Sequence, residues 1–139
     1  MKLILKNSKL KFIDESVAPT PTVYDTATFC GTSGLYKTDV TPLVLTASSN
    51  WGHSDFVPVS ELVEVNVCCL TSSNCPGILY FSSNDISTYL GFESDTNASL
   101  GMVQFTSFNP PAGAQYALIQ SYIGGGYYTP GSTITLMES

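Results

Sequence analysis

One short stretch of the chain places residues able to bind a sugar close together. Trp51, His53 and Asp55 occupy alternate positions of the sequence Trp-Gly-His-Ser-Asp. A flat indole can stack on the C–H face of a pyranose ring, while imidazole and carboxylate groups bind its hydroxyls. These residues are therefore our first candidate glycan site. The alternative is structural, with Trp51 covering one end of the fold and His53 and Ser54 forming a turn.

A second candidate surface lies near the end of the chain. Tyr122, Tyr127 and Tyr128 flank the glycine run 124–126. Tyrosines on glycine-rich loops are typical of recognition surfaces, because they supply large contact areas with few rotatable bonds. These tyrosines are expected either to bind a glycan or to pack against a neighbouring subunit.

The residues that an enzyme or a metal site needs are sparse. His53 is the only histidine, no nucleophile-elbow sequence accompanies it, and no acidic loop has EF-hand spacing. A glycosidase needs only two carboxylates at a defined separation. The candidates for such a pair are Asp55, Glu61, Glu64, Asp85, Glu93 and Asp95. We expect no catalytic residue, no metal and no cofactor.

Four cysteines, Cys30, Cys68, Cys69 and Cys75, lack the spacing of a zinc site. Alternation along the strand expected at 62–70 predicts that Cys69 shares the core face with the valines and that Cys68 lies on the opposite face. A disulfide from Cys68 or Cys69 to Cys75 is left open.

Charge divides the chain into two parts. Residues 1–13 carry four of the five lysines and no acid, whereas residues 14–139 carry one lysine and all eleven carboxylates. The acidic body, which contains no arginine, disfavours nucleic acid as a partner. The apolar runs are too short to span a membrane, and Leu3–Leu5 is too short for the apolar core of a signal peptide.

The basic segment is predicted to be an anchor. Apolar and cationic positions alternate in it, as in one or two very short strands around a turn. Added to the sheet edge of an acidic partner, such strands would give affinity through backbone bonds. The alternative is that they form the first strand of the body itself, with lysines protecting its edge. The anchor residues are Lys2, Leu3, Leu5, Lys6, Lys9, Leu10, Lys11 and Phe12.

The remainder of the chain is predicted to be all-β. Pro19 and Pro21 indicate an extended linker over 14–23, which places the boundary between residues 1–20 and the body, 21–139, near residue 20. Short strand-like runs then alternate with turn signals, which favours a sandwich of about eight antiparallel strands in two four-stranded sheets. The runs are 43–46, 55–58, 62–70, 77–82, 88–92, 101–108, 115–122 and 132–137.

Several segments together resemble lectin-like jelly-roll modules of phage head and tail fibres and bacterial surface proteins. They are Trp-Gly-His-Ser-Asp-Phe-Val-Pro-Val-Ser at 51–60, Gly-Ile-Leu-Tyr-Phe-Ser-Ser-Asn at 77–84, Thr-Tyr-Leu-Gly at 88–91, and Phe-Asn-Pro-Pro-Ala-Gly-Ala-Gln-Tyr-Ala-Leu-Ile at 108–119. The chain departs from that pattern with Phe81-Ser-Ser in place of Tyr-Asp-Ser, and with Leu118 in place of an arginine. Its opening, Met-Lys-Leu-Ile-Leu-Lys-Asn, is similar to the start of structural proteins from phages of gut Bacteroidetes, including crAss-like phages.

The resemblance implies a jelly-roll β-sandwich that attaches or binds glycans. We expect a non-enzymatic virion protein, a head or tail fibre subunit, made in the host cytoplasm without a signal peptide. Its expected partners are other virion proteins, reached through the N-terminal segment, and host polysaccharide, with no nucleic acid and no membrane. A homo-oligomer is expected, with a trimer favoured. The alternatives are a bacterial carbohydrate-binding module and a glycan-cleaving enzyme.

Overall fold

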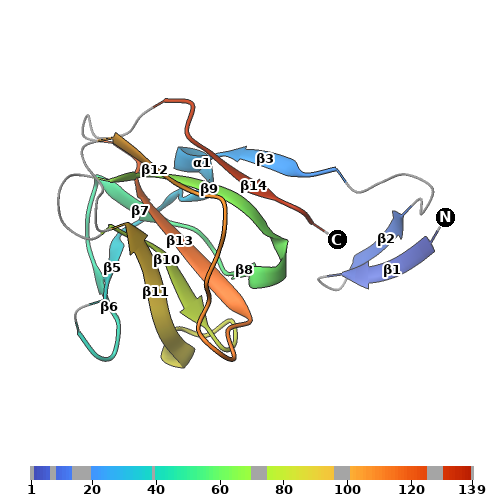
Figure 1. Cartoon of the computed structure of the whole chain (residues 1–139), viewed down its shortest axis with the longest axis horizontal. Coiled ribbons are helices and arrows are strands. Elements are labelled where there is room, and N and C mark those ends of the chain that lie inside the picture. Colours follow the sequence, from blue (N-terminus) through green and yellow to red (C-terminus); the bar gives the residue numbers. More distant parts are fainter. Residues whose placement is uncertain are drawn as a thin grey trace.

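The body of the protein consists of two antiparallel β-sheets packed face to face (Figure 1). The computed structural model describes residues 2–6, 9–13, 20–38, 40–69, 75–95, 101–124 and 130–138. The smaller sheet has the order β12 (Gly101–Phe105), β9 (Leu62–Cys69), β14 (Thr133–Leu136), β3 (Thr22–Asp25). The larger sheet has the order β11 (Tyr89–Asp95), β10 (Cys75–Phe81), β13 (Tyr116–Tyr122), β7 (Trp51–His53), β4 (Thr32–Ser33), and β8 (Val57–Pro58) also pairs with β13.

Within the described residues, helical structure is confined to three short turns. Helix α1 (Thr26–Phe29) follows β3, and two 3₁₀ turns, η1 (Val59–Glu61) and η2 (Ile86–Thr88), precede β9 and β11. The side chain of Asp25 caps α1 by accepting a hydrogen bond from the backbone N–H of Thr28. The antiparallel all-β class predicted from the strand-like runs is confirmed.

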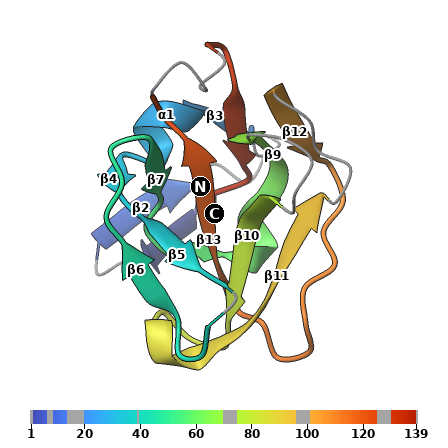
Figure 2. The ribbon, with the colours of Figure 1, turned by 90° about the vertical axis from the view of Figure 1, so that its left-hand side faces the viewer.

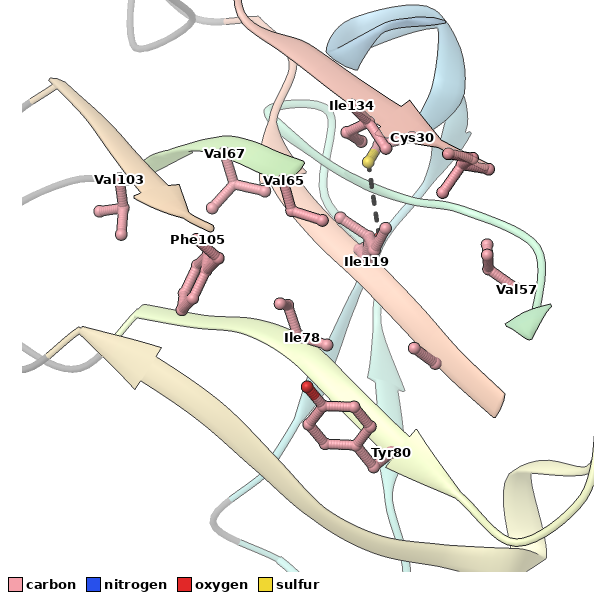
Figure 3. Close-up of a cluster of buried hydrophobic side chains, with 12 residues drawn as sticks. Cys30, Val57, Val65, Val67, Ile78, Tyr80, Val103, Phe105, Ile119 and Ile134 are labelled. Atoms are coloured by element: carbon pink, nitrogen blue, oxygen red, sulfur yellow. Dashed lines mark hydrogen bonds between the residues drawn. The ribbon is translucent and has the colours of Figure 1, made fainter. Parts of the chain in front are cut away.

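The main core lies between the two sheets (Figure 3). Val65 and Val67 of β9 face Ile78 and Tyr80 of β10, with Ile119 of β13 beside them, and all five are fully buried. These residues lie at alternate positions of their strands, because successive side chains of a strand point to opposite faces. Burial of this apolar surface is the main force that holds the sheets together.

The larger sheet is buried on its second face as well. Leu79 and Phe81 of β10 and Leu118 of β13 form a separate apolar cluster there with Leu43. A hairpin of β5 (Leu35–Lys37) and β6 (Val44–Thr46) supplies Tyr36 to the same cluster. Because both of its faces are covered, β13 is buried at every position from 117 to 121.

The N-terminal segment forms a hairpin of its own. β1 (Lys2–Lys6) and β2 (Lys9–Ile13) pair with each other in a two-stranded sheet, and Figure 1 shows this hairpin apart from the sandwich. One or two very short strands around a turn were predicted, and the described residues form two. In the described part of the chain the hairpin belongs to neither sheet of the body, contrary to the alternative in which it supplies the body's first strand.

Several strands differ from the expectation. In the described residues the body forms twelve strands, β3 to β14, in place of about eight, and the two large sheets have four and six strands in place of four each. The additional strands are mostly two or three residues long, too short for alternation to reveal them. The predicted linker also ends earlier than expected, because Val23 lies inside β3; residues 14–19 lie outside the described residues.

The prediction that Cys68 lies away from the core is wrong, because this side chain is fully buried. Its backbone N–H donates to Ser121 Oγ at 2.8 Å, and its thiol lies 3.3 Å from Ser132 Oγ. Neighbouring Asn66 is also buried, so both faces of β9 are covered at this point. The side chains of Cys69 and Cys75 lie outside the described residues.

Candidate functional site

An aromatic pair at one end of the larger sheet joins the two sites predicted from the sequence. Trp51 and Tyr122 are cross-strand partners in β7 and β13. Their ring centroids lie 4.3 Å apart and their planes are tilted by 35°. Both side chains are half-buried. The pair therefore offers a stacked aromatic surface held by strand pairing, a more rigid support than a loop.

A turn before β7 fixes the backbone at Trp51. Ser48 Oγ accepts hydrogen bonds from the backbone N–H groups of Asn50, at 3.2 Å, and of Trp51, at 3.1 Å. The N–H of Ile123, the residue after Tyr122, donates to Asn50 O at 2.7 Å. Backbone bonds thus connect the turn to both strands that carry the aromatic pair.

A shallow hollow of about 620 Å³ lies beside this turn. Its lining combines three hydroxyls with two apolar side chains. The lining residues are Ser33, Leu45, Ala47, Ser48 and Ser49. A surface of this composition can bind both the hydroxyls and the C–H groups of a neutral sugar.

His53 takes no part in this surface. Its side chain is only 7 % exposed, and Nδ1 lies 3.1 Å from the carbonyl oxygen of Gly34. Because that oxygen can only accept, Nδ1 carries the hydrogen and donates it. The ring also meets Tyr36 edge to face at 5.0 Å. His53 thus supports the β5–β6 hairpin, which Figure 2 shows close to β7. It lies at the end of strand β7, whereas the structural alternative expected it to form a turn with Ser54.

Asp55 is exposed but follows a buried residue. The neighbouring Ser54 Oγ accepts from the N–H of Ile119 at 3.0 Å and donates to the carbonyl of Asp55 at 2.7 Å. The structure thus brings Trp51 together with Tyr122 and assigns His53 to the interior. Tyr127 and Tyr128, the other members of the predicted second surface, lie outside the described residues.

Gln120 was not among the residues predicted to have a role. This side chain is fully buried and binds both backbone groups of one residue of β5. Tyr36 N–H donates to its Oε1 at 2.6 Å, and its Nε2 lies 3.4 Å from Tyr36 O. Gln120 therefore makes the two backbone hydrogen bonds that a neighbouring strand would make, and these bonds hold the β5–β6 hairpin against β13. The signal that could have suggested this is a glutamine directly after the apolar run 117–119 of β13.

Three of the six candidate carboxylates accept hydrogen bonds within the fold. Glu93 accepts hydrogen bonds from the Tyr80 hydroxyl, at 2.6 Å, and from the N–H of Asn109. Asp85 accepts from the backbone N–H and the hydroxyl of Ser87, and these two hydrogen bonds lower the pKa of its carboxyl group. Glu64 accepts from Gln104 at 2.5 Å.

Glu61 is buried, Asp55 is exposed, and the side chain of Asp95 lies outside the described residues. Within the ranges that the structure describes, no three His, Cys, Asp or Glu side chains are grouped to hold a metal ion. No helix in the same ranges is long and apolar enough to cross a membrane.

The chain was compared with known proteins by sequence and by structure. No family model, no curated protein and no solved structure matches it.

Proposed function

We propose that the protein is a non-enzymatic virion attachment subunit, a head or tail fibre component, whose β-sandwich binds neutral glycans of the host surface. The single observation that carries the glycan role is the Trp51–Tyr122 pair, two half-buried rings 4.3 Å apart near a hollow lined by serines and apolar residues. The virion setting rests on the resemblance of residues 51–119 to fibre modules.

The chemistry of the pair suits a pyranose. Carbohydrate C–H groups carry a small positive charge and favour the electron-rich face of an aromatic ring. The hydroxyls of Ser48 and Ser49, in the lining of the hollow, are suited to the polar edge of such a ring. The acidic body repels negatively charged polysaccharide, so the proposed ligand is a neutral one.

We propose further that the sandwich is a jelly roll. The support for a jelly roll is the order of eight strands in the two sheets. In chain order, from first to eighth, these strands are β3, β7, β9, β10, β11, β12, β13 and β14. The smaller sheet has the order first, eighth, third, sixth, and the larger sheet the order second, seventh, fourth, fifth. Two interleaved Greek keys have this arrangement. β4, β5, β6 and β8 are then insertions between the first and third of these strands.

The β1–β2 hairpin is the proposed anchor within the particle. It carries four lysines and no carboxylate, and it forms a sheet separate from the sandwich. An acidic surface with a free strand edge is the partner that suits it.

A glycan array tests the binding role. Full-length protein is expected to bind a subset of neutral glycans, and Tyr122→Ala to weaken that binding at least about tenfold, a loss typical of a truncated aromatic contact. Phe92→Ala is the matched control, because Phe92 is an exposed aromatic on β11, at the opposite edge of the larger sheet. Equal loss in both variants, or no binding by the wild type, would refute the role. Release of reducing ends from a bound glycan would favour the enzyme alternative.

A further inference from the structure

The hollow near the aromatic pair borders the backbone of Trp51 on two sides. On one side Ser48, from its lining, accepts a hydrogen bond from the Trp51 N–H at 3.1 Å. On the other side Ser33, also in the lining, pairs with Gly52 in the β4–β7 ladder. The N–H of the next residue, Gly34, donates to Trp51 O at 2.8 Å. The hollow therefore adjoins the residue that carries the indole.

The same hollow lies close to the strand that carries the second ring. Tyr122 is followed by Ile123, whose N–H donates to Asn50 O at 2.7 Å. A Cβ on the next residue, Gly124, would lie 3.8 Å from the backbone oxygen of Ser49, another lining residue. A ligand stacked on the two rings is thus placed to extend a short substituent into the hollow.

The apolar part of the hollow comes from Leu45 and Ala47, which are both exposed. Leu45 packs on the backbone of Gly34, because a Cβ on that glycine would lie 2.8 Å from Leu45 Cδ1. A methyl group placed against these side chains would be removed from water, which is favourable. A hydroxyl in the same place would lose hydrogen bonds to water and gain none from the two side chains.

The polar part of the hollow includes a hydroxyl that can only donate to a ligand. Ser48 Oγ accepts from the N–H of Asn50 at 3.2 Å and from the N–H of Trp51 at 3.1 Å. These two bonds use both lone pairs of the oxygen, so a ligand meets its hydrogen. The hydroxyls of Ser33 and Ser49, both exposed residues, can accept as well as donate.

We propose that the hollow binds the acetamido group of an N-acetylhexosamine whose pyranose ring stacks on Trp51 and Tyr122. This inference rests on the proposed glycan role and deepens it by naming the substituent that the site selects. An acetamido group presents a carbonyl oxygen that only accepts, a methyl group, and an N–H that only donates. It is uncharged, so the acidic body of the protein does not repel it.

Each part of the acetamido group has a counterpart in the lining of the hollow. The carbonyl oxygen accepts from Ser48, and the methyl group packs on Leu45 and Ala47. The N–H donates to the hydroxyl of Ser33 or Ser49. A hydroxyl at the same position of the sugar would satisfy Ser48 but leave the apolar part of the hollow unfilled.

A glycan array with matched pairs tests the inference. Each pair consists of two neutral oligosaccharides that differ only at C2 of the terminal sugar, N-acetylglucosamine against glucose and N-acetylgalactosamine against galactose. The full-length protein is expected to bind the acetamido member of at least one pair at least about tenfold more tightly, the combined effect of one buried methyl group and one added hydrogen bond. Saturation-transfer NMR of that ligand is expected to give its largest signal at the acetamido methyl.

Leu45→Asn removes the apolar side chain that receives the methyl group. The preference for the acetamido member is expected to fall to about twofold or less, while binding of the hydroxyl member stays at the wild-type level. Val44→Asn is the matched control, because Val44 is the neighbouring residue of β6, is 49 % exposed against 48 % for Leu45, and does not line the hollow. It is expected to keep the wild-type preference. Since the two side chains are about equally exposed, both variants should melt at the same temperature.

The outcomes separate this inference from the glycan role on which it rests. Binding of neutral glycans without a preference for the acetamido members, or with a preference for a 6-deoxyhexose in their place, overturns the inference and leaves the glycan role intact. An equal loss of preference in Leu45→Asn and Val44→Asn does the same. Failure to bind any neutral glycan refutes the glycan role, and the inference with it.

Discussion

Trp51 and Tyr122, 71 positions apart in the sequence, stand side by side as cross-strand partners on β7 and β13. Two consequences follow from this pairing. The backbone of β7 next to Trp51 has to pass close to the buried Cys30. The β5–β6 hairpin beside it also has to stay attached to the larger sheet.

Gly52, between Trp51 and His53, is predicted to tolerate no side chain. A Cβ at this position would lie 2.0 Å from Cys30 O and 2.8 Å from Ile123 Cδ1, and the first of these is backbone that cannot swing away. Gly52→Ala is expected to lower the free energy of unfolding by about 3 kcal/mol, the cost of forcing packed strands apart. Urea denaturation measures it.

Gly124→Ala is the matched control for that substitution. Its nearest contact would be Ser49 O at 3.8 Å, an ordinary van der Waals distance. A change within about 0.5 kcal/mol is expected. Equal free energies of unfolding for the two alanine variants would contradict the prediction. They would show that the distance between β7 and Cys30 O leaves room for a methyl group.

Gln120 is predicted to hold the β5–β6 hairpin on the sheet. Gln120→Ala leaves the N–H of Tyr36 without its partner and opens a cavity, so a loss of about 2–3 kcal/mol is expected. Hydrogen exchange at the Tyr36 amide should accelerate more than exchange at amides of β9, because the hairpin opens locally. Gln104→Ala, at an exposed glutamine of β12, is the control and should change neither measurement. Unchanged exchange at Tyr36 in the Gln120 variant would contradict the role.

Alkaline pH is predicted to destabilise the fold through Tyr80. Burial, and then the hydrogen bond to Glu93 and the charge of that carboxylate, raise the pKa of Tyr80. In the unfolded chain a tyrosine releases its proton near pH 10, whereas folded Tyr80 retains it. The contribution is therefore intact below about pH 10 and declines above it, by up to about 1.4 kcal/mol per pH unit.

Tyr80→Phe isolates this contribution. At neutral pH the variant should lose about 1–2 kcal/mol, because Glu93 loses one donor. Above pH 10 its unfolding free energy should fall less steeply than that of the wild type. Parallel pH profiles for the two proteins would contradict the assignment to Tyr80.

Removal of residues 1–20 is predicted to leave the body folded. β3 begins at Thr22, and neither large sheet contains a strand from the removed segment. Calorimetry should give a melting temperature within about 3 °C of the full chain, a shift of less than 1 kcal/mol for a domain of this size. Unfolding of the shortened chain would show that the hairpin belongs to the core.

The sequence predicted the strands that are long enough to show an alternation of apolar and polar residues. The runs at 62–70 and 115–122 contain β9 and β13, and the run at 77–82 covers most of β10, because long strands with valine, isoleucine and tyrosine leave a clear pattern. β7, in contrast, is three residues long and contains a glycine, which leaves no such pattern. Its residues were identified by their chemistry, as binding candidates, and their position in a strand was missed.

The candidate site depended on contacts between distant positions. His53 and Gln120 are buried because Gly34 and Tyr36 supply hydrogen-bond partners 19 and 84 positions away. The neighbouring sequence does not show that a polar residue will find a hydrogen-bond partner so far away in the chain. His53 was therefore interpreted as a ligand-binding group. Cys68 was misplaced for the same reason, since Ser121 and Ser132 approach it from β13 and from the start of β14.

The fluorescence of Trp51 shows whether the Trp51–Tyr122 pair contacts a bound neutral glycan. Trp51 is the only tryptophan of the chain, so its emission reports on the proposed site in the unmodified protein. Purified neutral capsular polysaccharides of gut Bacteroidetes are titrated into the full-length protein, with a charged polysaccharide as the comparison. The account predicts a saturable change in emission for at least one neutral polysaccharide, weakened at least about tenfold in Tyr122→Ala but retained in Phe92→Ala. Binding of a polysaccharide that leaves the emission of Trp51 unchanged, or that survives Tyr122→Ala, would contradict it.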